Sequence, residues 1–137
     1  MTKEEKIQKI IKTARRYLNT PYKKAARFYE APEVFNCSTF TKFIFEKVGK
    51  ILPKKAISQA TRGRKINPKN IKLGDLVFIR GRAGYYNSDF PDGVGHVAIF
   101  VGNNKVISAK GSFHRVVEEN VKKYLDEDQL RTIRRVL

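Results

Sequence analysis

The spacing of apolar residues changes about halfway along the chain, and this change constrains the fold more than any other feature. Up to residue 62 the apolar side chains recur at helical spacing, whereas after residue 75 they form short runs that are typical of strands. Helices followed by strands predict an α+β fold in which the helices pack on an antiparallel sheet. The 137 residues are enough to bury a core, and we expect a single domain over residues 1–137.

Three helices are expected in the first half of the chain. The first begins with capping-box spacing at Thr2 and Glu5. Its apolar stripe consists of Ile7, Ile10, Ile11, Ala14, Tyr17 and Leu18. After an ordered loop over residues 20–36, a second helix is predicted over residues 38–48 and a short third helix over residues 58–62.

The second half of the chain predicts an antiparallel sheet of about five strands. The strongest apolar run is followed by the turn signal Gly102-Asn103-Asn104, and a hairpin partner follows the turn. The expected strands cover residues 76–79, 96–101, 105–109, 115–117 and 131–136, with a short helix over residues 121–125.

Cys37, the only cysteine, lies where the second helix is expected to begin. A helix N-terminus has unpaired N–H groups and a positive dipole end, which favour the thiolate that acts as a nucleophile. His96, at the start of the strongest strand, would act as the base, and the backbone N–H of Cys37 would receive an oxyanion. This pair predicts acyl transfer or amide hydrolysis through a thioester.

Both residues also have a purely structural interpretation. A lone cysteine is more often a small buried apolar residue, and a lone histidine in a strand is usually structural. A single cysteine excludes an intramolecular disulfide and a multi-cysteine zinc site. His96 and His114 are too few for most catalytic metal sites, so we expect neither a metal nor another cofactor.

The chain is strongly basic, with 29 Lys and Arg against 13 Asp and Glu and a formal net charge of +16. Such a field attracts polyanions, among which we consider anionic cell-wall polymers, anionic lipid surfaces and nucleic acid. Nucleic acid is a possible partner but not a favoured one. A basic surface without a dedicated partner explains the composition equally well.

No apolar run reaches the roughly 20 residues that a membrane-spanning helix needs, so no transmembrane segment is expected. The first residues alternate in charge and do not form the apolar core of a signal peptide. The localisation therefore depends on export: we expect the cell envelope or secretion if an export segment is missing, and the cytoplasm otherwise. We expect a monomer.

Ordered motifs extend over nearly the whole chain. The segments are Thr20-Pro21-Tyr22, Asn36–Phe40, Leu52-Pro53, Ser58–Ala60 in part through Gln59, Gly74–Phe78 and His96–Asn103. In this order they resemble the motifs of the NlpC-type cysteine peptidases, the papain-like cell-wall hydrolases of bacteria. The resemblance implies a papain-like fold in which the nucleophile, at a helix N-terminus, packs on the sheet.

The resemblance also implies a substrate and a set of roles. Such enzymes cleave the stem peptides of peptidoglycan, often at a γ-D-glutamyl bond. Cys37 would be the nucleophile and His96 the base. Tyr22, Asn36 and Ser38 are the residues that we expect around the substrate and the oxyanion.

Some positions depart from the family pattern. Ser108, our third catalytic candidate, stands where the family commonly has a histidine, and a serine hydroxyl orients an imidazole more weakly. His114 would replace it only if its loop folds back. Asn36 replaces an acidic residue that helps relatives to bind a free substrate amine, and Thr39 replaces a glycine.

Two other functions remain open at this point. A papain-like module with weakened catalysis would use its basic surface to bind a cell-wall polymer or nucleic acid. Transfer of acyl groups from lipids, a chemistry of distant relatives of this fold, is disfavoured because the sequence indicates no acyl-chain groove and no membrane anchor.

Overall fold

The structure, a computed structural model, describes residues 1–82 and 84–137. The helices are α1 (Lys3–Arg16), α2 (Cys37–Glu46) and α3 (Ala56–Gln59). The strands are β1 (Arg64–Lys65), β2 (Leu76–Ile79), β3 (His96–Gly102), β4 (Lys105–Lys110), β5 (Arg115–Asn120) and β6 (Leu130–Arg135). Short 3₁₀ helices are η1 (Phe28–Glu30), η2 (Pro68–Asn70), η3 (Gly111–Phe113) and η4 (Val121–Tyr124).

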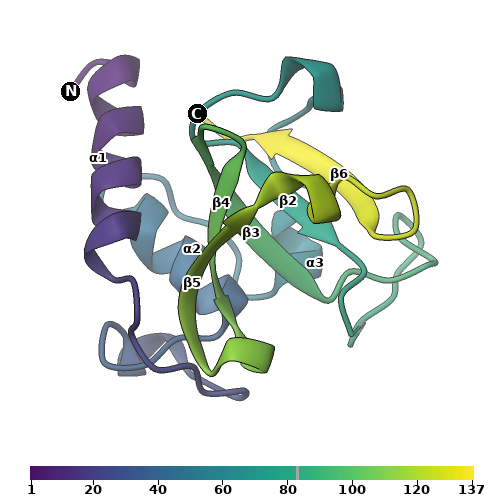
Figure 1. The fold of residues 1–137 in the computed structure, drawn as a ribbon, viewed down its shortest axis with the longest axis horizontal. Coiled ribbons are helices and arrows are strands. Elements are labelled where there is room, and N and C mark those ends of the chain that lie inside the picture. The colour runs from purple at the N-terminus through teal and green to yellow at the C-terminus, as the bar shows by residue number, and fades with distance from the viewer. Residues whose placement is uncertain (83) are drawn as a thin grey trace.

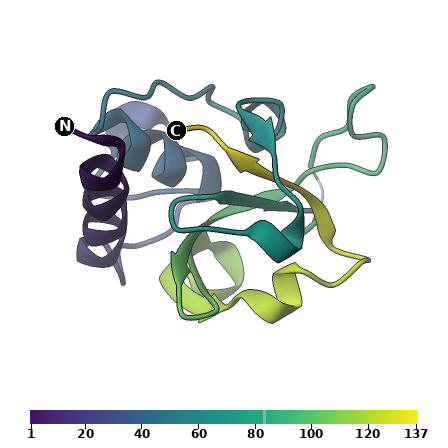
Figure 2. The same ribbon diagram turned by 90° about the horizontal axis from the view of Figure 1, so that it is seen from above.

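The six strands form one antiparallel sheet in the order β1-β6-β2-β3-β4-β5. All three helices share a core with one face of this sheet, and α2 and α3 lie behind it in Figure 1. Figure 2 shows α1 at one end of the molecule, beside α2. The opposite face of the sheet is covered by η4 and has a smaller apolar core of its own.

The α+β fold expected from the sequence is confirmed, with differences in detail. Helix α2 begins one residue earlier than predicted, at Cys37, and the segment expected as a short helix after the fourth strand is the 3₁₀ helix η4. The sheet has six strands instead of about five, because β1 adds to its edge. This strand contains only Arg64 and Lys65, two exposed residues that pair with β6 and offer no apolar periodicity to read.

Aromatic side chains join the loop before α2 to the helix itself. Phe35 and Phe40 are both fully buried, and their rings pack edge-to-face with centroids 5.2 Å apart. Such pairs contribute about 0.5–1.5 kcal/mol beyond the burial of their area. The end of this loop and the first turn of α2 are thereby held in one position.

Gln59 connects α3 to the first turn of α2. Its side chain is fully buried, and its Nε2 donates to the carbonyl oxygens of Ser38 at 3.1 Å and Pro53 at 2.9 Å. Its Oε1 accepts a hydrogen bond from the Thr41 hydroxyl at 2.7 Å. Every polar group of this buried amide is therefore paired, and the pairs fix the turn that carries Cys37.

Replacing Gln59 with Met, a residue of similar length, should lower the free energy of unfolding by about 1–3 kcal/mol, the cost of one buried polar group without a partner. The change leaves the Pro53 carbonyl without its donor, whereas the Thr41 hydroxyl can still donate to the Ser38 carbonyl oxygen, 3.1 Å away. Urea unfolding measures the effect, with Gln8→Met on the exposed face of α1 as the control. Equal stabilities of the two variants would contradict this account of α3.

Candidate active site

Asn36 caps the N-terminus of α2 and uses its whole side chain to do so. Its Oδ1 accepts hydrogen bonds from the Thr39 backbone N–H at 2.9 Å and from the Ser38 hydroxyl at 3.2 Å. Its Nδ2 donates to the carbonyl oxygens of Lys24 and Ala26, both at 3.3 Å. The residue thus combines an N-cap with an anchor for the preceding loop.

The cap occupies two residues that we expected to contact substrate. The side chains of Asn36 and Ser38 are hydrogen-bonded within the protein, so a substrate contact stays a prediction for them. Ser38 contributes differently, because its backbone N–H lies close enough to the Cys37 sulfur to stabilise an anion there. The cap therefore fixes the position of Cys37 at the first residue of α2.

Cys37 is the first residue of α2, and its side chain is partly exposed. Burial of the sulfur raises the pKa of the thiol, against the opposing effect of the N–H groups of Val97, Ser38 and Cys37 itself. The sequence predicted a thiol made acidic by the helix end. Here desolvation outweighs the helix N–H groups, so the thiol is protonated at neutral pH in the free protein.

The contact with Val97 places the sulfur at the start of β3. The pairing of β3 with β4 covers Ile99 to Gly102 and does not reach Val97, whose N–H faces Cys37 instead. The preceding residue is His96, so Cys37 and His96, the expected nucleophile and base, both lie at this end of the sheet. Within the described residues, no hydrogen bond joins Cys37 Sγ to the His96 ring; catalytic contacts often tighten only when substrate binds.

The His96 imidazole is held from one side by two hydroxyl groups. Its Nε2 lies 3.0 Å from Ser108 Oγ on β4 and 3.1 Å from Tyr124 Oη in η4. Since Nε2 is engaged there, Nδ1 is the ring nitrogen left to accept a proton from the thiol. The sequence-based pairing of His96 with Ser108 is present in the structure, and no hydrogen bond joins His96 to the exposed His114 in the described chain.

The two hydroxyls lead to a buried carboxylate. Tyr124 Oη lies 3.2 Å from Ser108 Oγ and donates to Glu119 Oε1 at 2.8 Å. Glu119 also accepts from Lys110 Nζ at 3.0 and 3.1 Å and pairs with Lys123. A continuous polar network therefore runs from His96 to two lysines.

Burial and the positive charge of Lys110 lower the pKa of His96 to about 4, and the charge of Glu119 offsets only part of this shift. The imidazole is therefore neutral at pH 7. A neutral imidazole is the form that a general base requires.

Tyr22 is a further neighbour of the thiol. Its ring packs over the backbone of Gly111, where an added Cβ would lie 3.1 Å from Tyr22 Cε1. Burial, and then the neighbouring Cys37, raise the pKa of the Tyr22 hydroxyl. The structure thus brings Cys37, Tyr22, His96 and Ser108 to one site.

Two residues of the network, Tyr124 and Glu119, were missed by the sequence-based prediction. Tyr124 follows β5 in a 3₁₀ turn without a recognisable motif. Glu119 lies in a strand whose burial does not alternate regularly, so its inward direction could not be read from its neighbours. Only the fold brings them to His96.

Two features are absent from residues 1–82 and 84–137. No group of three or more His, Cys, Asp or Glu side chains there lies close enough to hold a metal ion. No helix in this part of the chain has the length and apolarity needed to cross a membrane.

A cysteine at the N-terminus of a helix, packed against a strand that starts with a histidine, is the arrangement expected of a papain-like fold. Comparison with known proteins agrees: the model of the NlpC/P60 family matches residues 19–135. The chain belongs to the NlpC/P60 family.

Among curated relatives, the "Probable endopeptidase p60" of Listeria monocytogenes is 34% identical over 101 residues, which cover 74% of this chain and 18% of the relative. The "Gamma-DL-glutamyl hydrolase" of Bacillus subtilis is 30% identical over 120 residues, covering 87% of this chain and 26% of the relative. The chain therefore spans about a fifth to a quarter of the length of these proteins.

Among solved structures, the NlpC/p60 domain of the peptidoglycan hydrolase SagA has a TM-score of 0.73 and 27% identity, covering 94% of this chain and 97% of that one. The peptidoglycan hydrolase RipB from Mycobacterium tuberculosis has a TM-score of 0.77 at 23% identity, covering 98% of this chain and 66% of that one. The second likeness concerns the fold alone.

The buried neutral His96 should make the fold sensitive to acid. The unfolded chain binds a proton near the ordinary pKa of 6.5, whereas the folded chain binds it only near 4, so stability is lost as pH falls between these values. The loss attributable to His96 is about 3 kcal/mol. Urea unfolding at both ends of this range should show a smaller loss for His96→Gln than for the wild type.

His114→Gln, at the exposed second histidine, is the matched control for the substitution. A His96→Gln variant that loses as much stability on acidification as the wild type would show that His96 titrates normally.

Proposed function

We propose that this chain is a cysteine endopeptidase that cleaves stem peptides of peptidoglycan through a thioester on Cys37, with His96 as base. The observation that carries the proposal is the meeting of the α2 N-terminus with the start of β3, where the Val97 N–H faces the Cys37 sulfur. Ser108 is the third catalytic residue, because it holds Nε2 of the base. The names of the relatives, which include an endopeptidase, a γ-DL-glutamyl hydrolase and a peptidoglycan hydrolase, support the class of reaction and substrate.

The reaction starts from a neutral thiol and a neutral imidazole. Attack forms a bond between Cys37 Sγ and the carbonyl carbon, while the thiol proton moves to Nδ1 of His96. The carbonyl oxygen becomes an oxyanion that the backbone N–H of Cys37 stabilises, with the Tyr22 hydroxyl as a second candidate donor. Proton transfer in step with attack avoids forming a thiolate in a site where burial disfavours it.

The thioester forms when the tetrahedral intermediate breaks its C–N bond and Nδ1 returns the proton to the leaving amine. A water molecule then gives a proton to Nδ1 and attacks the thioester carbon. Cleavage of the C–S bond releases the acid and restores the thiol and imidazole.

For the scissile bond we propose a γ-D-glutamyl linkage, following the resemblance and the named γ-DL-glutamyl hydrolase. Asn36 carries no charge; its Oδ1 is engaged in the helix cap and its Nδ2 in hydrogen bonds to the preceding loop. We therefore do not expect recognition of a free substrate amine by residue 36.

Cys37→Ala should lower the release of peptides from purified peptidoglycan by at least about 10³-fold, because it removes the atom that forms the thioester. Chromatography of the soluble fragments measures the rate, with His114→Gln as the control for substitution at an exposed site. Hydrolysis at the wild-type rate by Cys37→Ala would end this proposal.

The net charge of +16 supports a second property, retention on anionic cell walls. The retained fraction should fall between about 0.1 M and about 1 M salt, because the Debye length shrinks from about 10 Å to about 3 Å. Cosedimentation with purified walls measures it, and Cys37→Ala should bind as the wild type does. A catalytically weakened binding module would show this retention without hydrolysis, whereas retention independent of salt would exclude charge as its cause.

A further inference from the structure

We propose that Tyr124 and Glu119 are positioning residues that set the tautomer of His96 through a directed chain of hydrogen bonds. The inference rests on the proposed function, because both residues would act only through the base. Tyr124 is 1% exposed and Glu119 is 8% exposed, so both residues are buried and their polar groups bond mainly within the protein. The direction of the chain follows from the number of protons that each group carries.

The direction of this chain of hydrogen bonds is set at its carboxylate end. An ionised carboxylate only accepts hydrogen bonds, so Tyr124 Oη must donate its single proton to Glu119 Oε1, 2.8 Å away. Tyr124 has no second proton. Toward Ser108 and His96 it is therefore an acceptor.

The same count assigns the next two groups. Nε2 of His96 lies 3.1 Å from Tyr124 Oη, and this contact is attractive only if Nε2 carries a hydrogen. Ser108 Oγ lies 3.0 Å from Nε2 and 3.2 Å from Tyr124 Oη, so it shares with Tyr124 the single hydrogen of Nε2 and donates its own proton to Tyr124 Oη. All the protons in the chain then point toward Glu119.

A neutral imidazole with its hydrogen on Nε2 has its lone pair on Nδ1. This is the tautomer that the proposed mechanism needs, because Nδ1 takes the proton of Cys37. A chain pointing the other way would place the hydrogen on Nδ1 and remove its capacity to act as base. Ser108 alone does not decide between the two, because a serine hydroxyl both donates and accepts.

Two lysines keep Glu119, at the far end of the chain of hydrogen bonds, as an ionised carboxylate that only accepts hydrogen bonds. Lys110 Nζ lies 3.0 and 3.1 Å from the two oxygens of Glu119, and Lys123 forms a further ion pair. Burial alone would raise the pKa of Glu119, but the hydrogen bonds from Lys123, Lys110 and Tyr124 hold it below its usual value. The lysines also offset the carboxylate charge, so the network orients the imidazole without favouring its protonation.

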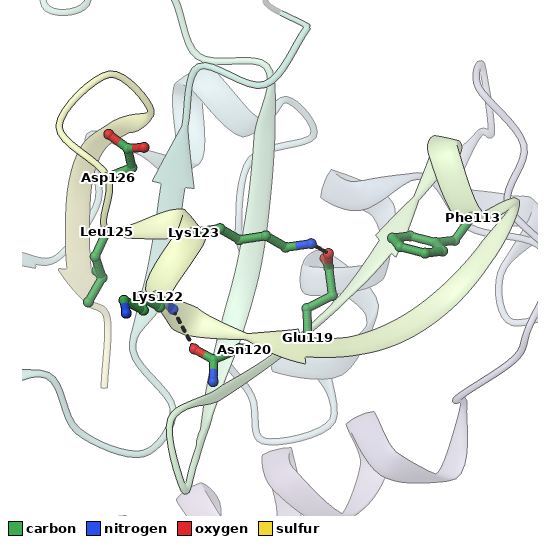
Figure 3. Close-up of a pocket in the computed structure, with 7 residues that line it drawn as sticks. All are labelled: Phe113, Glu119, Asn120, Lys122, Lys123, Leu125 and Asp126. Carbon is green, nitrogen blue, oxygen red and sulfur yellow. Dashed lines mark hydrogen bonds and ion pairs between the residues drawn. The ribbon is translucent and has the colours of Figure 1, made fainter.

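Glu119, at the outer end of the chain of hydrogen bonds, lines a surface pocket. Figure 3 shows the side chain of Lys123 extending from η4 across to Glu119 on β5. The pocket is lined by Phe113, Glu119, Asn120, Lys122, Lys123, Leu125 and Asp126. Glu119 can therefore be changed at the surface end, two hydrogen bonds away from the base.

Glu119→Gln is the sharpest substitution, because it keeps the shape of the side chain and adds two donor hydrogens. The amide can donate to Tyr124, which frees the Tyr124 proton to point toward His96. We expect kcat on peptidoglycan fragments to fall about tenfold with KM unchanged. The control is Glu118→Gln, the exposed neighbour that pairs with Arg15 and should retain wild-type kcat.

Tyr124→Phe removes the hydroxyl and keeps the ring. It should also lower kcat about tenfold without changing KM, because Ser108 loses its acceptor and with it the direction of its proton. Tyr29→Phe, at a side chain that is 80% exposed, is the control. If Tyr124→Phe fails to fold, Glu119→Gln alone decides the outcome.

The tautomer can be read without any substrate by two-bond ¹H–¹⁵N correlation NMR of the imidazole rings. The protein has two histidines, so the His114→Gln variant shows only the imidazole signals of His96. In that background we expect the Nε2–H form near neutral pH, and a measurable share of the Nδ1–H form after Glu119→Gln.

An Nδ1–H ring in the parent protein, or an unchanged tautomer or unchanged kcat in Glu119→Gln, would overturn the inference. The proposed function fails separately. If Cys37→Ala hydrolyses peptidoglycan at the wild-type rate while the tautomer of His96 responds to Glu119, the chain of hydrogen bonds stands and the thioester mechanism does not.

Discussion

The contact of the α2 N-terminus with the first residues of β3 is the constraint on which the rest of the site depends. The Asn36 cap fixes where the helix begins, and Gln59 and the Phe35–Phe40 pair hold its first turn against the neighbouring elements. Because β3 and β4 are not paired at Val97, the N–H of that residue is directed at the Cys37 sulfur. A shift of α2 by one residue would move the Cys37 sulfur away from the unpaired N–H of Val97.

The electrostatics of the site favour neutral partners. Burial raises the pKa of the Cys37 thiol and, together with Lys110, lowers that of His96 to about 4. A preformed thiolate–imidazolium pair is therefore disfavoured in the free protein, and the two residues are suited to proton transfer during attack. The buried network behind His96 fits this picture, because Lys110 and Lys123 cancel the charge that Glu119 would otherwise bring to the imidazole.

Local patterns were sufficient for the elements that carry Cys37 and His96. An apolar helical face and a strong apolar strand are visible in the chain, and ordered motifs led to Ser108. The strand β1 was missed because two exposed basic residues have no periodicity, and Tyr124 and Glu119 were missed because only the path of β5 and η4 brings them to His96. The pKa of Cys37 was misjudged for a related reason: the helix end is local, whereas desolvation depends on the whole fold.

The distance between Cys37 Sγ and His96 Nδ1 in a crystal structure is the most direct test of the account. Because Nε2 is held by Ser108 and Tyr124, we predict that Nδ1 faces the sulfur at about 3–4 Å, a reach compatible with proton transfer in a free enzyme. An imidazole whose Nδ1 is turned away from Cys37, or a sulfur separated from the ring by the main chain of β3, would contradict it.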